Sequence, residues 1–210
     1  LGVSPEKIYT VSVMPCVAKK AEREMELFYE EYAGHDVDVV VTTRELVRMI
    51  RSAHISPDTL KDIESDRPMQ EGTGAGVIFG ATGGVMEAAL RSAYFLIKGE
   101  NPPVDAFKAV RAQGFNENNG VQEATFQVDD ITVRTAVVSG LGNTRALLNK
   151  IEKGEVQYDF VEVMACPGGC VGGGGQPIND GEELAFTRGK NLYDRDEHAN
   201  LRYSHENPDI

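Results

Sequence analysis

Cysteine is scarce in this chain: 3 of its 210 residues are cysteine. A small, odd number of cysteines does not build the disulfide framework of small secreted proteins. It is consistent with a reducing compartment and with metal or redox chemistry, so we expect a cytoplasmic protein. Long hydrophobic runs are also absent, since none reaches the roughly 18 residues that cross a bilayer. The sequence begins with Leu1 and has no signal peptide there, and we expect it to be part of a larger protein.

Positive charge is in short supply as well. Lys and Arg total 21 against 33 Asp and Glu, which gives a formal net charge of −12. This balance argues against nucleic acid and anionic membranes as partners. Hydrophobic residues make up 41% of the chain, as in globular proteins. The length allows one large domain or two smaller lobes.

Local patterns predict an alternation of strands and helices. Short runs rich in apolar and β-branched residues predict strands, at residues 8–14, 37–42, 121–128, 131–138 and 160–164. Helix-forming stretches are expected at residues 17–32, 43–54, 85–98 and 144–153, with Asn143 as the cap of the last. Thr42 and Glu45 have the spacing of a capping box. The polar tail is expected to hold one or two short helices. The order predicts an α/β fold with a largely parallel sheet.

Two short segments echo one another. VSVMPC ends at Cys16 and VEVMAC ends at Cys166, and both follow a predicted strand. The echo is either a coincidence between two buried strands or a sign of two half-sites that face one ligand. In open α/β sheets, ligands bind beyond the carboxyl ends of strands, where both cysteines fall.

Cys166 and Cys170 enclose Pro-Gly-Gly, and a run of four glycines follows at residues 172–175. Two thiols at this spacing can reach one soft metal centre, and glycine allows the backbone to approach a bulky cluster. The competing interpretation is a flexible loop with incidental cysteines. A thioredoxin-type pair has two intervening residues rather than three. Zinc is an alternative with weak support, because the four histidines form no ligand pair.

Cys16 precedes a predicted helix, where a thiolate is stabilised by the helix dipole. Lys19 follows about one turn later, and its ammonium group suits an anionic ligand. The alternative for Lys19 and Lys20 is a solvated helix face.

These motifs resemble those of a known family. MPCVAKKAE is similar to the second signature of iron-only hydrogenases, and EVMACPGGCVGGGGQP is similar to the third. FGATGGVMEAALRSAY and the terminal SHENPDI resemble further segments of that family. The resemblance implies the C-terminal portion of a two-lobed catalytic domain with mostly parallel sheets flanked by helices. Residues 1–180 would form that portion and residues 181–210 its C-terminal helical tail.

The resemblance also implies a cofactor, the H-cluster: a 4Fe-4S cube joined to a di-iron unit that carries CO, cyanide and a bridging dithiolate. Cys16 and Cys166 would ligate the cube, and Cys170 would bridge the cube and the di-iron unit. Lys19 would donate a hydrogen bond to a cyanide. The walls of the di-iron pocket would come from the apolar side chains of Met14, Phe79 and Met164. Ordinary core packing is the alternative for the two methionines.

One family signature is absent from this chain. It lies upstream in the family and supplies the fourth cube ligand and a proton-transferring cysteine. We therefore expect the isolated chain to be inactive and to lack an intact cluster. Expected partners are the remaining N-terminal lobe and a ferredoxin or nicotinamide-linked redox subunit, with self-association as a further alternative. No carboxylate is assigned to a proton relay, and Glu22 and Glu162 are interpreted as structural or supporting groups.

The resemblance predicts an oxidoreductase of anaerobic hydrogen metabolism that reversibly reduces protons to H2. Two alternatives stay open: a non-enzymatic relative that carries or assembles iron–sulfur clusters, and a sensory hydrogenase-like protein. The segment from Phe79 to Tyr94 favours the enzyme.

Overall fold

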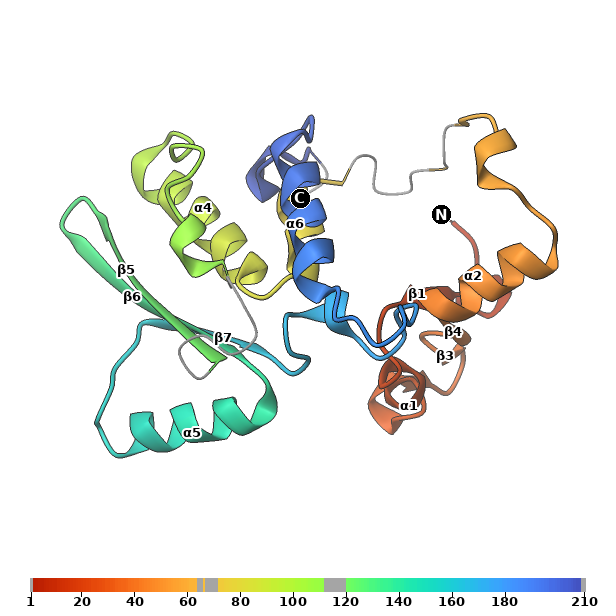
Figure 1. The fold of residues 1–210 in the computed structure, drawn as a ribbon, viewed down its shortest axis with the longest axis horizontal. Coiled ribbons are helices and arrows are strands. Elements are labelled where there is room, and N and C mark those ends of the chain that lie inside the picture. Colours follow the sequence, from red (N-terminus) through yellow and green to blue (C-terminus); the bar gives the residue numbers. More distant parts are fainter. Residues whose placement is uncertain (1, 64–65, 67–71, 112–119, 209–210) are drawn as a thin grey trace. The chain divides into compact units, whose positions relative to one another are not determined.

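A computed structural model describes residues 2–63, 66, 72–111 and 120–208. The chain forms two compact units (Figure 1). Unit 1 comprises Leu1–Pro68 and Gly173–Glu182, and unit 2 comprises Met69–Gly172 and Glu183–Ile210. Asp209 and Ile210, the end of the SHENPDI segment, lie outside the described residues. The expected division at residue 180 stays a prediction.

Unit 1 is built around two parallel strands. Strand β1 (Val11–Met14) pairs with β4 (Val39–Thr42), with Val11 opposite Val39 and Met14 opposite Thr42. A short antiparallel pair joins β2 (Tyr29–Glu30) to β3 (Gly34–His35). The helices are α1 (Lys19–Glu22) and α2 (Thr43–Ser52).

The predicted capping box begins α2. The Thr42 hydroxyl accepts a hydrogen bond from the Glu45 amide at 3.2 Å, and the Glu45 carboxylate accepts one from the Thr42 amide at 2.8 Å. The bond from the Thr42 amide, aided by Lys20 and the Thr42 hydroxyl, lowers the pKa of Glu45 to about 2. The capping box therefore satisfies the Thr42 and Glu45 amides at this helix start.

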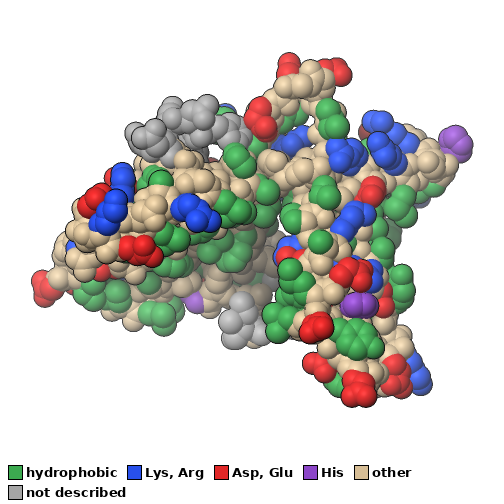
Figure 2. All heavy atoms as spheres, turned by 90° about the horizontal axis from the view of Figure 1, so that it is seen from below, with side chains coloured by type: hydrophobic (Ala, Val, Ile, Leu, Met, Phe, Trp, Pro, Cys, Tyr) green, Lys and Arg blue, Asp and Glu red, His purple; other side chains and the backbone are tan. Residues whose placement is uncertain are grey.

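The predicted helix over residues 17–32 is wrong for most of its length. Helix α1 ends at Glu22, a 3₁₀ turn covers Glu26–Phe28, and β2 follows. Helices in proteins are stabilised mainly by burying an apolar face, but here Leu27 is 83% exposed and Met25 is also exposed. Figure 2 shows hydrophobic side chains among charged ones on the surface of both units. Good helix formers without a buried face did not extend the helix.

Unit 2 contains a three-stranded mixed sheet. The predicted strands β5 (Val121–Val128) and β6 (Ile131–Ser139) form an antiparallel hairpin, which turns at Asp129 with a φ of 51°. Strand β7 (Phe160–Met164) pairs with β6 in parallel. The helices of this unit are α3 (Gly74–Val77), α4 (Gly84–Lys98), α5 (Leu141–Glu152) and α6 (Ala185–Glu197).

Strand β6 is covered on both faces. Val137 belongs to a core cluster with Met86 and Leu90 of α4, whereas Ala136 and Val138 pack with Leu147 of α5. Figure 1 shows α4 and α5 on opposite sides of this sheet. This arrangement of parallel and mixed sheets flanked by helices confirms the α/β fold class.

The start of α5 differs from the prediction. The helix begins at Leu141, three residues earlier than expected, and Asn143 lies inside it. The Asn143 side chain donates a hydrogen bond to the Ser139 carbonyl at 2.7 Å instead of capping the helix. The reason is Gly140, whose φ of 88° turns the chain sharply at the end of β6.

A buried ion-pair network joins α4 to α6. Arg91 is 2% exposed and donates to both carboxylate oxygens of Asp196, at 2.8 and 2.7 Å, and to Glu87 at 2.6 Å. Arg111 completes the coordination of Glu87 at 2.6 and 2.7 Å. Each buried charge therefore has a partner, as burial requires. Among the described residues, no helix is long and apolar enough to cross a membrane.

Candidate metal centre

The loop that follows β7 carries two of the three cysteines. Cys166 is half-buried and Cys170 is exposed, and neither forms a disulfide. The Gly169 amide donates to the Cys166 carbonyl at 3.0 Å, and a 3₁₀ turn follows at Cys170–Gly172. Gly168 and Gly169 have φ values of 81° and 96°. These left-handed values explain why glycines separate the two thiols.

The loop packs closely against the segment that precedes α4. A Cβ on Gly169 would lie 2.7 Å from both the Gly80 carbonyl oxygen and the Thr82 nitrogen. Side chains do not tolerate contacts of this length with the main chain, so Gly169 is required on steric grounds as well. Gly80 also lies near Val171, the residue after Cys170: a Cβ added to Gly80 would be 3.6 Å from the Val171 side chain.

Three hydrogen bonds hold the loop to the rest of unit 2. The Gly168 amide donates to the Ser139 hydroxyl at 3.0 Å, and the Gly168 carbonyl accepts from the Thr82 amide at 3.2 Å. The guanidinium of Arg188 donates to the Val171 carbonyl at 3.2 Å. The residues that link the two cysteines thus form a turn. Hydrogen bonds hold this turn and Val171 after it to α6, to β6 and to the segment before α4.

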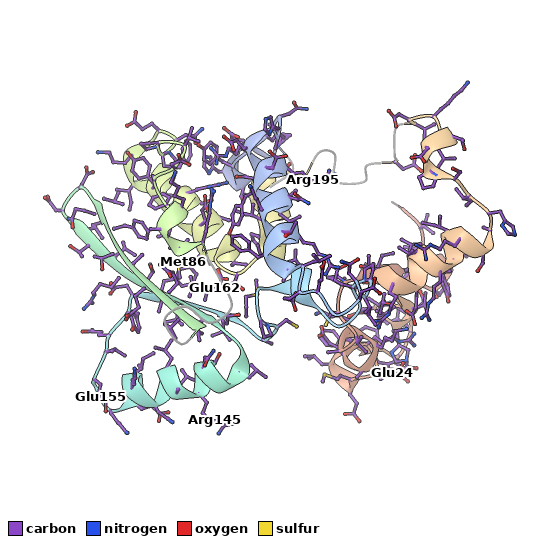
Figure 3. All side chains as sticks on the ribbon, viewed as in Figure 1. Glu24, Met86, Arg145, Glu155, Glu162 and Arg195 are labelled. Carbon is purple, nitrogen blue, oxygen red and sulfur yellow. The ribbon has the colours of Figure 1, made fainter. Side chains whose placement is uncertain are left out.

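Glu162 binds the main chain at the start of α4. It is 5% exposed, and its two carboxylate oxygens accept from the Gly83 amide at 2.7 Å and the Met86 amide at 2.6 Å. Figure 3 shows Glu162 beside Met86 at the start of α4. Burial raises the pKa of Glu162, although the two peptide donors oppose the shift. A carboxylate from β7 therefore caps α4.

The third cysteine lies in unit 1. Cys16 is half-buried and follows Met14, the last residue of β1, by two positions. The glycine run after Cys170 reaches this place, because the Gly175 amide donates to the Pro15 carbonyl at 2.9 Å. A Cβ on Gly175 would lie 3.0 Å from both Pro15 and the Thr42 side chain. The last glycine of the run is therefore packed beside the residue that precedes Cys16.

Lys19 is the first residue of α1. Its ammonium group pairs with Glu22 at 2.6 Å, and the two side chains are 42% and 38% exposed. Helix α1 has four residues, so the helix dipole expected to act on the Cys16 thiolate is much weaker than a long helix would provide.

The structure distributes the predicted site residues over the two units. Cys166, Cys170, Phe79 and Met164 belong to unit 2, whereas Met14, Cys16 and Lys19 belong to unit 1. Phe79 is 47% exposed, and Met164 is half-buried at the end of β7. In the part of the chain that the structure describes, no three or more His, Cys, Asp or Glu side chains are grouped to hold a metal ion.

Sequence reasoning missed Thr82 and Ser139, which hold the cysteine loop. Neither has a sequence signal of its own, because their shared partner, Gly168, is 86 residues from Thr82 and 29 residues from Ser139 in the chain.

The residue types present suit a soft metal group. Thiolates are the ligands that iron–sulfur clusters use, and glycines let peptide donors approach cluster sulfurs.

The sequence model of the iron-only hydrogenase large subunit, C-terminal domain, matches residues 2–174. The chain belongs to this family. It is 46% identical over its whole length to the NADP-reducing hydrogenase subunit HndD of Solidesulfovibrio fructosivorans and covers 35% of that protein. It is 43% identical to iron hydrogenase 1 of Clostridium pasteurianum, with 98% of this chain and 36% of the relative covered.

A second group of relatives is named for iron–sulfur assembly and not for hydrogenase activity. The chain is 34% identical to the cytosolic iron-sulfur assembly component 3 of Rattus norvegicus, with 87% of this chain and 39% of that protein covered. Among solved structures, an FeFe hydrogenase HydA1 from Chlamydomonas reinhardtii matches with a TM-score of 0.75 and 37% identity. That match covers 100% of this chain and 58% of the other. The chain thus spans roughly a third to two fifths of these curated relatives.

Proposed function

We propose that this chain is the C-terminal portion of the catalytic domain of an iron-only hydrogenase that reversibly reduces protons to H2. The observation that carries the proposal is the loop from Cys166 to Cys170. Its glycines have left-handed φ values and tight contacts, and it presents two thiols from one fixed turn. The high identity to two hydrogenases over nearly the whole chain supports the same proposal.

The H-cluster would be held by Cys16, Cys166 and Cys170, with the fourth cube ligand from a segment outside this chain. When bound, the cluster supplies an iron site for proton reduction and a path for electrons. Cys170 would be the ligand shared by the cube and the di-iron unit. It is the more exposed of the two thiols in the loop, which suits a sulfur shared between two groups.

Lys19 is proposed to hydrogen-bond a cyanide of the di-iron unit. Its pairing with Glu22 is at the protein surface, and such exposed pairs are weak enough to be exchanged for another anionic acceptor. Met14, Phe79 and Met164 are proposed to line the di-iron unit and exclude water. Phe79 is exposed and the two methionines are half-buried, so these apolar side chains are accessible for contact with a bound group.

The proposed partners are the remaining N-terminal lobe and a ferredoxin or nicotinamide-linked redox subunit. HndD, by its name, is a subunit of an NADP-reducing hydrogenase. Of the two redox partners, this name favours the nicotinamide-linked subunit over ferredoxin. We propose a cytoplasmic location, because the three cysteines form no disulfide in the structure; one relative is a periplasmic hydrogenase subunit.

Infrared spectroscopy of the complete protein tests the proposal. We expect bands of bound CO and cyanide together with H2 evolution from a reduced dye. The Cys170→Ser variant should lose those bands, because the bridging sulfur is gone, while the electron paramagnetic resonance signal of a cube persists. Cys166→Ser is the matched control: it also leaves three cube thiolates but keeps the bridging sulfur, so it should retain more of the CO and cyanide bands than Cys170→Ser. CO bands retained in Cys170→Ser would contradict the bridging role.

The similarity to cytosolic iron-sulfur assembly component 3 favours a second candidate, a protein that carries or assembles iron–sulfur clusters. That candidate predicts a cube without CO or cyanide bands and without H2 evolution. A sensory hydrogenase-like protein would show the bands with little turnover. The same infrared and activity measurements therefore separate all three candidates.

A further inference from the structure

Both chain neighbours of Cys16 lie beside the end of the glycine run. The Gly175 amide donates to the Pro15 carbonyl at 2.9 Å. A Cβ on Gly174 would lie 3.6 Å from the Val17 side chain. All of these residues belong to unit 1. The position of the Cys16 main chain therefore depends on how this end of the glycine run is held.

Arg44 holds the same two glycines. Its guanidinium donates to the Gly174 carbonyl at 3.0 Å, and its amide donates to the Gly175 carbonyl at 2.9 Å. Arg44 is the second residue of α2, and this helix packs against both β1 and β4 (Figure 1). One residue, fixed in place by its helix, thus binds two successive carbonyls of the glycine run.

The glycine run has little room to move at this point. Gly175 is buried, and a Cβ there would lie 3.0 Å from Pro15 and from the Thr42 side chain that caps α2. Gly175 is therefore enclosed between the residue before Cys16 and the start of α2. Among the hydrogen bonds named above, only the one from the Arg44 guanidinium uses a side chain. It is the contact that a substitution can remove.

We infer that Arg44 is a positioning residue for Cys16, because its guanidinium fixes the glycine run against the residues on either side of that cysteine. The inference rests on the proposed function, in which Cys16 ligates the cube. Groups that orient a metal ligand matter for binding, and their loss typically weakens metal affinity or activity by about 10–100-fold. Arg44 acts through the main chain of the glycine run and not as a ligand.

The reactivity of the Cys16 thiol tests the inference in the complete protein prepared without the cluster. Cys16 is half-buried, so its reaction with iodoacetamide depends on local opening. Arg44→Ala removes one charge-assisted hydrogen bond, and we expect Cys16 to be alkylated roughly tenfold faster. Cys166 and Cys170 belong to unit 2 and should keep their rates. Mass spectrometry of the digested protein measures all three rates in one sample.

Four further variants separate this contact from the charge and from the helix. Arg44→Lys keeps a cationic donor and should restore most of the slow rate. Arg48→Ala removes an exposed arginine one turn later on α2 and should leave Cys16 unchanged. Gly175→Ala forces the glycine run away from Pro15 and should accelerate the reaction, whereas Gly174→Ala places its Cβ at an ordinary contact distance and should not.

The cluster-loaded complete protein provides a second test. We expect Arg44→Ala to bind iron about 10–100-fold more weakly in competition with a chelator. The electron paramagnetic resonance signal of its reduced cube should broaden, because Cys16 is less firmly held. The urea midpoint without the cluster should stay nearly unchanged, since the lost bond is at the surface. Arg44→Lys should restore both the affinity and the signal.

Equal alkylation of Cys16 in Arg44→Ala and in the unmodified protein would overturn the inference, and so would an equal acceleration in Arg48→Ala. Unchanged iron affinity together with an unchanged resonance signal in Arg44→Ala would also contradict it. The absence of any cube in the unmodified complete protein would instead overturn the proposed function. The alkylation rates would then still decide whether Arg44 holds Cys16 in place.

Discussion

At the scale of single residues, Glu162 shows how one carboxylate serves two elements. It lies in the middle of β7, four residues before Cys166, and its oxygens satisfy two amides at the start of α4. Helix starts favour negative charge, and they leave amides without partners inside the helix. Glu162 fills this role from a strand, so it ties the strand that leads to Cys166 to the segment that contacts Gly169.

The raised pKa of Glu162 has a testable consequence. A carboxyl whose pKa is raised on folding binds protons more tightly in the folded state, so its contribution to stability is largest at low pH and is lost as the pH rises. We expect the unmodified protein to lose stability relative to Glu162→Gln as the pH rises from about 4 through the raised pKa. Urea unfolding of both proteins over a pH series measures this difference.

All other titrating groups are present in both proteins, so their contributions cancel in the difference between the two unfolding free energies. If the unmodified protein instead gained stability relative to Glu162→Gln over this range, the two peptide donors would outweigh burial. The pKa of Glu162 would then be lowered, and the carboxylate would be a net stabilising cap.

Lys19 provides a second test at this scale. Its exposed pair with Glu22 contributes at most about 1 kcal/mol to stability. We expect Lys19→Asn in the complete protein to reduce H2 evolution strongly, because a donor to the cyanide is lost, with nearly unchanged thermal unfolding. Lys20→Asn, which removes the neighbouring surface pair with Glu45, is the matched control. Equal activity of Lys19→Asn and the unmodified protein would make Lys19 an ordinary surface residue.

At the scale of elements, the cysteine loop depends on two separate properties of glycine. Gly169 has a positive φ and also no room for a Cβ, whereas Gly99, the residue that follows α4, has a positive φ of 72° and no described atom within 4 Å of its Cβ position. The pair therefore separates backbone strain from steric conflict.

We expect Gly99→Ala to cost roughly 1–2 kcal/mol of unfolding free energy from its left-handed conformation and to leave iron binding unchanged. Gly169→Ala should cost more and should also reduce the iron retained after reconstitution, because the new Cβ displaces the loop from Gly80 and Thr82. Urea unfolding and iron analysis measure the two effects. Equal iron content in both variants would show that the loop position is not needed for the cluster.

At the scale of the whole molecule, the three thiols are divided between the two units. Cys16 belongs to unit 1, and Cys166 and Cys170 belong to unit 2, while the glycine run at residues 172–175 crosses from one unit to the other. A cube uses four ligands of this type, and this chain has three cysteines. This chain therefore provides one cysteine fewer than a cube requires.

We expect this chain by itself to show no H2 evolution and no intact cluster after incubation with iron and sulfide under reducing conditions. Electron paramagnetic resonance and a H2-evolution assay with a reduced dye measure the outcome, and the complete protein is the positive control. A stable cube with turnover from the 210 residues alone would show that the fourth ligand comes from within the chain or from a second copy.

The sequence by itself determined what depends on local pattern. The capping box at Thr42 and the strands β5, β6 and β7 were predicted because caps and strand patterns involve neighbouring residues. The family was also identified from contiguous motifs, and the comparisons confirm it. The assignment of individual site residues stays a prediction.

The tertiary structure decided which polar groups are buried and with what partners. Arg91 and Glu87 have a helical i,i+4 spacing, but Asp196, the other partner of Arg91, is 105 residues away from it. The burial of Thr82 and the cap provided by Glu162 depend on equally distant contacts. The failure of the predicted helix over residues 17–32 has the same cause, since its helix-forming residues found no surface against which to bury a face.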